Sequence, residues 1–275
     1  MPYIETRDGT ELYVKEWGDG RPVILTHGWP LNADSWDAQA LDLAKAGYRV
    51  IAYDRRGFGR SDQPWTGYDY DTLADDLADV LEATDADDDA TIIGFSMGGG
   101  EVARYMSRHE GEGVIGAGLI ASVVPYLLQT DDHANGAPES VFQQMRDGII
   151  ADRAKFFRRT FTPAFYGVGY ISHPVSDDVL DHSTSLALMA GLHPTLACLD
   201  AFAHTDFRPD LPAIDVPTLI IHGTSDQTVP IDISARAAAA GIAQSQLIEY
   251  DGAPHGLNVT HAARLSEDLL AFLGR

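Results

Sequence analysis

Short apolar, β-rich runs alternate along this chain with longer segments that have the spacing of amphipathic helices. The predicted strands are residues 22–26, 48–53, 91–95, 114–121, 217–222 and 246–250. This alternation favours a mostly parallel, doubly wound α/β sheet, because right-handed crossovers place helices on both faces. Residues 11–17 alternate polar and apolar side chains, which is typical of a half-solvated edge strand.

The alternation stops between residues 124 and 212. This segment contains helix-like stretches at 140–150 and 177–190, which Pro and Gly residues separate. We therefore expect an α/β core made of residues 1–123 and 213–275, into which residues 124–212 are inserted as a helical cap. The length of 275 residues fits one large α/β domain with such an insertion.

The helices that flank the predicted strands have recognisable ends. Asn32 is placed to cap a helix that runs to about residue 46, and Asp71 or Thr72 is placed to cap the next one. Further helices are predicted at residues 97–109, 231–240 and 260–273.

Ser96 lies in the sequence Gly94-Phe95-Ser96-Met97-Gly98, directly between a predicted strand and a predicted helix. This is the context of a nucleophile elbow, in which a serine occupies a sharp, strained turn and glycines avoid clashes nearby. The start of the following helix favours negative charge at this point. The pattern therefore predicts a nucleophilic serine.

A neutral serine is a weak nucleophile, so it needs a histidine base that an acid holds in the correct tautomer. In this fold the chain order is serine, acid, histidine. Asp226 and His255 fit, because they follow the last two predicted strands. Asp215 and Asp251 are alternative acids, but the first precedes its strand and the second lies too near the histidine.

The other histidines compete with His255 for the role of base. His222 ends a strand, and His261 lies in the first turn of the last helix. We expect these two, and the histidines of the cap, to be either buried with their hydrogen bonds satisfied or exposed to solvent.

His27-Gly28-Trp29-Pro30 follows the first buried strand, where this fold supplies its second oxyanion donor. The backbone N–H groups of Trp29 and Met97 would bind the negatively charged oxygen of a tetrahedral intermediate. We expect His27 itself to be a structural hydrogen-bonder rather than a second base.

The charge balance excludes several partners. Asp and Glu number 41 against 19 Lys and Arg, which gives a formal net charge of -22 and opposes binding to nucleic acid or anionic membranes. The three lysines are Lys15, Lys45 and Lys155, and Asp greatly outnumbers Glu, as expected of a protein kept soluble in concentrated salt. We hypothesise a halophilic source; the alternative is Arg-for-Lys drift in a high-GC genome.

Cys198 is the only cysteine, so no intrachain disulfide forms, and we expect it to be a small core residue. With no basic, apolar leader at the start of the sequence, the expected location is the cytoplasm. The uncharged run 113–130 suits a buried strand better than a membrane helix. The acidic run 85–89 lacks the Gly and Glu of a calcium loop, so we predict no metal.

The chain resembles the α/β-hydrolase superfamily, and within it is similar to the cofactor-free haloperoxidases, also called perhydrolases or arylesterases. The resemblance is carried over essentially the full length by residues 27–30, 54–61, 94–105, 205–210 and 254–256. It implies Ser96 as nucleophile, His255 as general acid/base, Asp226 as its orienter, and Trp29 and Met97 as oxyanion donors, and it implies no cofactor.

The resemblance also implies a reaction. Small carboxylic esters would acylate Ser96, and either water or hydrogen peroxide would accept the acyl group. Pro30, beside the oxyanion hole, would position a carbonyl near the acyl carbon, a feature linked in the family to peroxide as acceptor. The product would then be a peracid, which oxidises halide. The family further suggests a homo-oligomer.

By analogy of position, the acyl pocket lies between core and cap. Its expected lining is Trp29, Met97, Val123, Phe142, Phe157, Phe161 and Val229, and Pro30 is also expected at the substrate pocket. Apolar residues at helical spacing also suit ordinary packing, so the cap aromatics are equally expected to be core.

Other activities share these residues. Lactonase, lactamase and C–C hydrolase activities use the same triad, whereas dehalogenases and epoxide hydrolases of this fold would need an aspartate in place of Ser96. A ligand receptor or scaffold that retains the triad with slow or no turnover is the alternative from another class.

Overall fold

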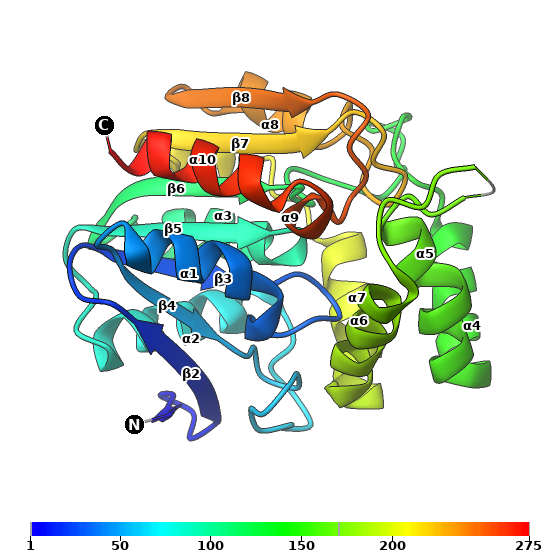
Figure 1. The fold of residues 1–275 in the computed structure, drawn as a ribbon, viewed down its shortest axis with the longest axis horizontal. Helices are drawn as coiled ribbons and strands as arrows, with labels where there is room; N and C mark the ends of the chain where they lie inside the picture. Colours follow the sequence, from blue (N-terminus) through cyan, green and yellow to red (C-terminus); the bar gives the residue numbers. More distant parts are fainter. Residues whose placement is uncertain (1, 170, 275) are drawn as a thin grey trace.

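Eight strands form one sheet in the computed structural model, which describes residues 2–169 and 171–274. The strands are β1 (Tyr3–Glu5), β2 (Glu11–Trp17), β3 (Pro22–Thr26), β4 (Arg49–Tyr53), β5 (Ala90–Phe95), β6 (Val114–Ile120), β7 (Thr218–Gly223) and β8 (Ser245–Tyr250). Their order is β1-β2-β4-β3-β5-β6-β7-β8 (Figure 1). β2 pairs antiparallel with β1 and β4, and the other pairs are parallel. The predicted mostly parallel α/β sheet is confirmed.

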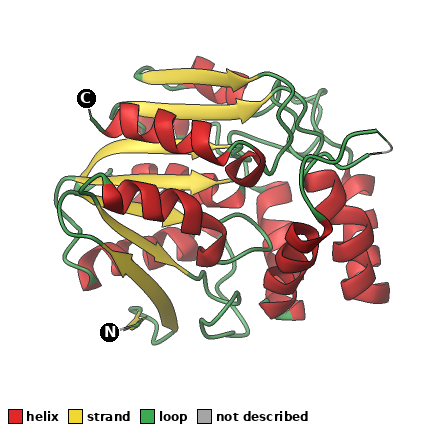
Figure 2. Cartoon of the chain, in the orientation of Figure 1, coloured by secondary structure: helices red, strands yellow, loops and turns green. Residues whose placement is uncertain are grey.

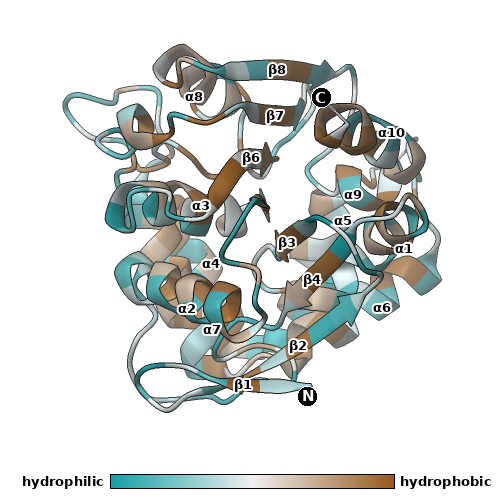
Figure 3. Ribbon diagram, turned by 90° about the vertical axis from the view of Figure 1, so that its left-hand side faces the viewer, coloured by the Kyte–Doolittle hydropathy of each residue, from teal (hydrophilic) through white to brown (hydrophobic). Residues whose placement is uncertain are grey.

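Helices cover both faces of this sheet. One face carries α1 (Asp37–Lys45), α9 (Leu257–Thr260) and α10 (Ala262–Leu273), and the other carries α2 (Tyr70–Ala83), α3 (Met97–Arg108) and α8 (Ala235–Gly241) (Figures 1 and 3). The short helices η1 (Ala33–Trp36) and η3 (Leu211–Ala213) precede α1 and β7.

The hydrophobic core lies in two layers, one on each face of the sheet. In β3, Ile24 belongs to the cluster that includes Leu77 of α2, whereas Val23 and Leu25 belong to the cluster that includes Leu269 of α10. Because both faces of the central strands are covered, these strands need apolar residues at successive positions. This is why they are visible in the sequence as short continuous apolar runs.

β2 is not the edge strand that its alternating pattern predicts. Tyr3 of the three-residue strand β1 pairs with Tyr13, and their rings meet edge to face with centroids 5.3 Å apart. β2 therefore lies one position inside the edge. Three residues are too few to give a strand signal of their own, so the sequence pattern did not reveal β1.

Two helices begin elsewhere than predicted. Asp69, rather than Asp71 or Thr72, caps α2, because its carboxylate accepts from the Thr72 backbone N–H over 3.0 Å. Tyr70 can then occupy the first helical turn as a buried side chain. The helix predicted at 231–240 begins only at Ala235, and the last helix is divided between α9 and α10. Asn32 caps η1 as predicted.

A group of helices is inserted between β6 and β7. It consists of α4 (Glu139–Phe156), the π-helical turn η2 (Phe157–Phe161), α5 (Thr162–Phe165), α6 (Asp177–Met189) and α7 (Leu192–His204). Figure 2 shows these helices grouped beyond the carboxyl ends of the strands. The inserted helical region is thus confirmed, while its boundaries at residues 124 and 212 stay a prediction.

No single helix within residues 2–169 and 171–274 is both long and apolar enough to cross a membrane. Helices α6 and α7 reach the required length and hydropathy only when taken together, and they are bent by 98° at the break between them.

Candidate active site

Ser96 occupies a strained turn between β5 and α3. Its backbone angles, φ 54° and ψ -117°, lie in a region that residues other than glycine rarely adopt. The glycines on either side are sterically required. A Cβ atom on Gly94 would lie 2.3 Å from the Gly98 carbonyl oxygen, and one on Gly98 would lie 2.3 Å from Thr26 Oγ1. The turn has the geometry of a nucleophile elbow.

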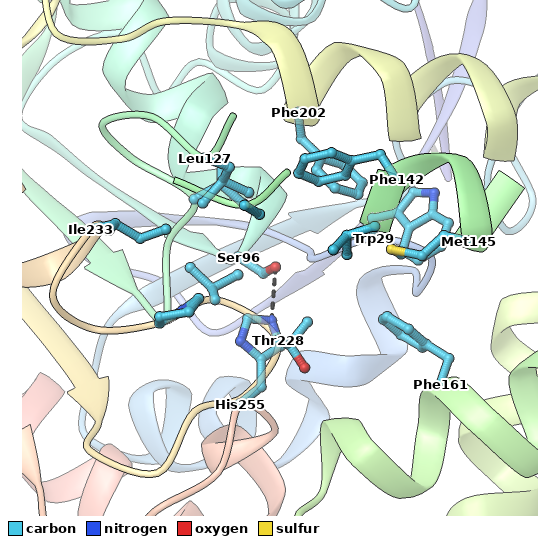
Figure 4. Close-up of a pocket in the computed structure, with 15 residues that line it drawn as sticks. Trp29, Ser96, Leu127, Phe142, Met145, Phe161, Phe202, Thr228, Ile233 and His255 are labelled. Carbon is cyan, nitrogen blue, oxygen red and sulfur yellow. Dashed lines mark hydrogen bonds between the residues drawn. The ribbon is translucent and has the colours of Figure 1, made fainter. Parts of the chain in front are cut away.

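Ser96, His255 and Asp226 form a chain of hydrogen bonds. Ser96 Oγ lies 2.9 Å from His255 Nε2 (Figure 4). On the other side of the ring, His255 Nδ1 lies 2.6 Å from Asp226 Oδ2. Asp226 comes from the loop after β7, and His255 from the loop after β8. All three residues are buried. The fold therefore brings together the three residues that chain order had selected.

The Asp226 carboxylate is surrounded by donors. Its Oδ1 accepts from the backbone N–H groups of Thr228 and Val229, each over 2.8 Å, while its Oδ2 faces His255 and also His222 Nε2 at 3.1 Å. Burial alone would raise the pKa of Asp226, but the two histidines outweigh this effect and hold that pKa well below its usual range. Asp226 is therefore ionised and able to orient His255.

The loop after β3 lies directly against Ser96. A Cβ atom on Gly28 would lie 3.0 Å from Ser96 Cβ, so the loop can come this close only with glycine at that position. The Gly28 carbonyl oxygen accepts from the Leu31 backbone N–H over 2.9 Å. In a trans peptide the next N–H points opposite to the carbonyl, so the Trp29 N–H points away from Leu31. The roles of Trp29 and Met97 as oxyanion donors stay predictions.

His27 fixes that loop as a neutral imidazole. The Arg55 backbone N–H donates to His27 Nε2 over 3.0 Å, so the proton of the neutral ring is on Nδ1, which donates to the Gly28 carbonyl oxygen over 3.0 Å. Burial, together with the positive charge of Arg55, lowers the pKa of His27 well below its usual range. His27 has the structural role expected of it.

An apolar cavity opens beside Ser96 and His255. It encloses about 560 Å³ of atom-free space, including part of its open mouth. Apart from the triad residues Ser96 and His255, it is lined by Trp29, Val123, Leu127, Ala137, Val141, Phe142, Met145, Phe161, Phe202, Thr228, Val229, Pro230 and Ile233. Figure 4 shows Phe142, Met145, Phe161 and Phe202 gathered around Trp29 on one side of the serine. None of the lining side chains carries a carboxylate, an ammonium or a guanidinium group.

The cavity includes five of the expected lining residues, namely Trp29, Val123, Phe142, Phe161 and Val229. Pro30 instead borders a smaller neighbouring cavity that Phe161 separates from the first. Phe157 is fully buried and packs edge to face on Trp29 with ring centroids 5.7 Å apart. Met97 is also fully buried and does not line the cavity.

Sequence reasoning missed other lining residues, above all Leu127, Met145, Phe202 and Ile233. Met145 lies three positions after Phe142 in α4, so helical spacing puts both on one face, and this signal could have revealed it. Phe202 packs edge to face on Trp29 with ring centroids 5.5 Å apart, a contact that no local pattern predicts.

Metal ligands are not grouped in the described part of the chain: within residues 2–169 and 171–274, no three His, Cys, Asp or Glu side chains are placed to hold an ion.

Comparison with known proteins identifies the class to which this fold and site belong. Residues 21–262 match the family model of the alpha/beta hydrolase fold. The chain is 45% identical to a non-heme chloroperoxidase of Streptomyces lividans and 40% identical to a bifunctional esterase/perhydrolase of Acinetobacter calcoaceticus, each alignment covering 99% of both chains.

A solved structure agrees with these sequence relatives. The crystal structure of a bromoperoxidase from Bacillus anthracis is 42% identical and superimposes with a TM-score of 0.94, covering 99% of this chain and 100% of that one. The chain therefore belongs to the α/β-hydrolase fold family and, within it, to the family of non-heme chloroperoxidases and perhydrolases.

Proposed function

We propose that this protein is a serine hydrolase of small carboxylic esters that also transfers the acyl group to hydrogen peroxide. The observation that carries the proposal is the hydrogen-bonded chain Ser96–His255–Asp226, which opens into an uncharged, apolar cavity. Such a cavity suits a neutral acyl group, and such a chain activates a serine for attack on its carbonyl carbon.

In the acylation step, Ser96 Oγ attacks the ester carbonyl carbon while its proton moves to His255 Nε2. The Trp29 and Met97 backbone N–H groups donate to the oxygen that becomes negatively charged. When the tetrahedral intermediate collapses, the bond to the leaving alkoxide breaks. His255 Nε2–H protonates this oxygen, and an acyl group remains on Ser96.

In the deacylation step, His255 Nε2 takes a proton from the acceptor, whose oxygen attacks the acyl carbon. The Ser96 ester bond then breaks, and the proton returns to Ser96 Oγ. Water as acceptor gives a carboxylic acid, and hydrogen peroxide gives a peracid. No metal or cofactor takes part in either step.

Peroxide as an acceptor is supported by the relatives, which include proteins named as chloroperoxidases and an esterase/perhydrolase. We assign to Pro30 the positioning of a backbone carbonyl beside the acyl carbon. Pro30 lies next to the oxyanion loop residue Trp29 and borders the smaller cavity beside Phe161. Replacing Pro30 by Leu should lower peracid formation relative to hydrolysis, and an unchanged ratio would remove Pro30 from the mechanism.

The test of the proposed function is the ratio of peracid formation to hydrolysis for a short acyl ester with added peroxide, with Ser96→Ala as the blank. Both products should form at rates that Ser96→Ala abolishes. Fast hydrolysis without peracid would leave an ordinary small-acyl esterase. Lactone or lactam turnover without ester turnover would favour the other activities of the triad. Release of one equivalent of product per protein, or of none, would favour a receptor.

The setting of this activity is also part of the proposal. We infer a cytoplasmic enzyme, because its single cysteine suits a reducing compartment. We also infer that it works in concentrated salt, because a net charge of -22 is strongly negative for a chain of this size. Residues 124–212 act as the cap over the core formed by 1–123 and 213–275. Self-association into a homo-oligomer remains an expectation from the family.

A further inference from the structure

His222 is an enclosed histidine that the proposed mechanism does not use. It lies in β7, and its ring is completely closed to solvent. Nε2 is 2.8 Å from the Val229 carbonyl oxygen and 3.1 Å from Asp226 Oδ2. Both neighbours are acceptors, so Nε2 must carry a proton. Nδ1 has no hydrogen-bond partner in the described part of the chain.

An unpartnered nitrogen in a buried imidazole is unusual in a native protein. A proton on Nδ1 would have no acceptor in the described part of the chain, whereas a proton on Nε2 has one. The Nε2–H of His222 is thus a fixed donor to the Val229 carbonyl oxygen, and the Asp226 carboxylate oxygen Oδ2 lies 3.1 Å from the same nitrogen.

Asp226 Oδ2 consequently serves two histidines. His255 Nδ1 approaches it to 2.6 Å, and His222 Nε2 approaches it to 3.1 Å. The other oxygen, Oδ1, is held by the backbone N–H groups of Thr228 and Val229. The carboxylate therefore cannot rotate without breaking its hydrogen bonds to the two backbone N–H groups and to His255.

We propose that His222 is a positioning residue of the triad, which holds Asp226 Oδ2 in place for His255 and draws part of the carboxylate charge away from His255. It also ties the acid to the cavity wall, because the same N–H reaches the carbonyl of Val229, a lining residue. The inference rests on the proposed function, in which His255 is the base that Asp226 orients.

A carboxylate oxygen that also lies against a second N–H group stabilises the protonated form of its neighbouring histidine less. His222 therefore keeps the base available at lower pH. Removing the His222 donor should move the acid limb of the kcat/KM profile to higher pH.

The other groups that contact His255 are uncharged, so the charge that its ring faces is the Asp226 carboxylate. The rings of Phe95 and Phe165 pack on His255, with centroids 5.4 and 4.9 Å away, and Ser96 faces its Nε2. On β8, Glu249 is opposite His222 and pairs with Arg236.

Asp251, in the loop after β8, faces Thr224 Oγ1 at 3.3 Å. The remaining neighbours of the Asp226 carboxylate, Thr228 and Val229, contribute uncharged backbone N–H groups.

The test compares His222→Leu, which removes the donor, with His222→Gln, whose amide nitrogen can reach the position of Nε2. The pH dependence of kcat/KM on a short aryl ester is measured for both. His222→Leu should move the acid limb to higher pH by on the order of 0.5 unit and lower the plateau several-fold, and His222→Gln should restore most of both. His261→Leu is the matched control, because its ring contacts Thr260 and Tyr250 instead of Asp226.

A second readout does not depend on turnover. In a Ser96→Ala background, the titration of His255 followed by NMR should shift in the same direction when His222 is replaced by Leu. If Ser96→Ala retains full esterase activity, the proposed function fails, yet this titration still decides the role of His222.

An acid limb and a titration that are unchanged in His222→Leu would overturn the proposal. Equal shifts in the Leu and Gln variants would overturn it too, because packing rather than the donor would then be responsible. If His222→Leu does not fold, His222→Asn takes its place, since its shorter amide stops short of Asp226, and the same two comparisons with His222→Gln apply.

Discussion

Arg55 and Glu101 form an ion pair in which both side chains are almost completely closed to solvent. Arg55 also donates from Nη2 to the His27 carbonyl oxygen over 2.5 Å, and Glu101 accepts from the Tyr53 hydroxyl over 2.6 Å. The pair thus joins the loop that bears Trp29 to α3, the helix that starts beside Ser96. The two halves of the predicted oxyanion hole are held together by one buried pair of charges.

Breaking the Arg55–Glu101 ion pair should lower the stability of the fold. Glu101→Ala leaves Arg55 charged and unpaired in the interior, so the free energy of unfolding should fall by about 3–5 kcal/mol. Urea denaturation measures this change in the free energy of unfolding. The control is Glu139→Ala, since Glu139 is half exposed where it pairs with His204, and its loss should cost about 1 kcal/mol or less. Equal losses in the two variants would contradict the buried pair's importance.

Cys198 should make stability depend on alkaline pH. Burial raises the pKa of this fully enclosed thiol from 9.0 to about 12. Between these values the unfolded thiol has lost its proton while the folded one keeps it, so rising pH favours unfolding. Relative to Cys198→Ala, the wild type should lose up to about 1.4 kcal/mol per pH unit above pH 9 and nothing below pH 8. Parallel pH curves from urea denaturation would refute this prediction.

Phe161 should limit the length of the acyl group. Its ring borders the cavity and lies edge to face on Trp29, with centroids 5.0 Å apart. Phe161→Ala makes room for about two more methylene groups, each worth about 0.8 kcal/mol of burial, so the kcat/KM ratio of butyrate to acetate esters should rise roughly tenfold. Phe156→Ala is the control, because this neighbouring ring lies outside the lining set. A rise in both variants would point to a general loosening of the cap.

Salt should raise the melting temperature. With a net charge of -22, the folded protein repels itself, and the Debye length shortens from about 10 Å at 0.1 M salt to about 3 Å at 1 M. The midpoint of thermal unfolding in KCl should therefore climb by several degrees, with most of the gain below about 0.5 M. A midpoint indifferent to KCl would reject adaptation to salt, and a gain that continues linearly to high concentration would indicate salt exclusion from the surface instead of screening.

The sequence predicted what depends on local pattern. The central strands are covered on both faces and therefore form apolar runs. The glycines around Ser96 indicate a sharp turn between a strand and a helix, because side chains at their positions would clash. Chain order was sufficient to select Asp226 and His255. β1 was missed because three residues carry no period.

What the sequence could not predict is where side chains meet across the fold. His222 was expected to be either buried with its hydrogen bonds satisfied or exposed to solvent, because nothing in its sequence neighbourhood shows that its ring faces Asp226. Pro30 and Phe157 were expected in the cavity from their position in the chain, but Pro30 borders the neighbouring cavity and Phe157 is buried against Trp29. Such choices are made by tertiary packing, which leaves no periodic trace.

The chemistry and the walls of the cavity stand on different stretches of chain. Ser96, Asp226 and His255 are carried by the ends of β5, β7 and β8, whereas Phe142, Met145, Phe161 and Phe202 are carried by the inserted helices. Mutation in the inserted segment can therefore change which acyl groups are accepted while the reacting atoms stay where they are. One catalytic scaffold can in this way diversify into a set of enzymes with different substrates.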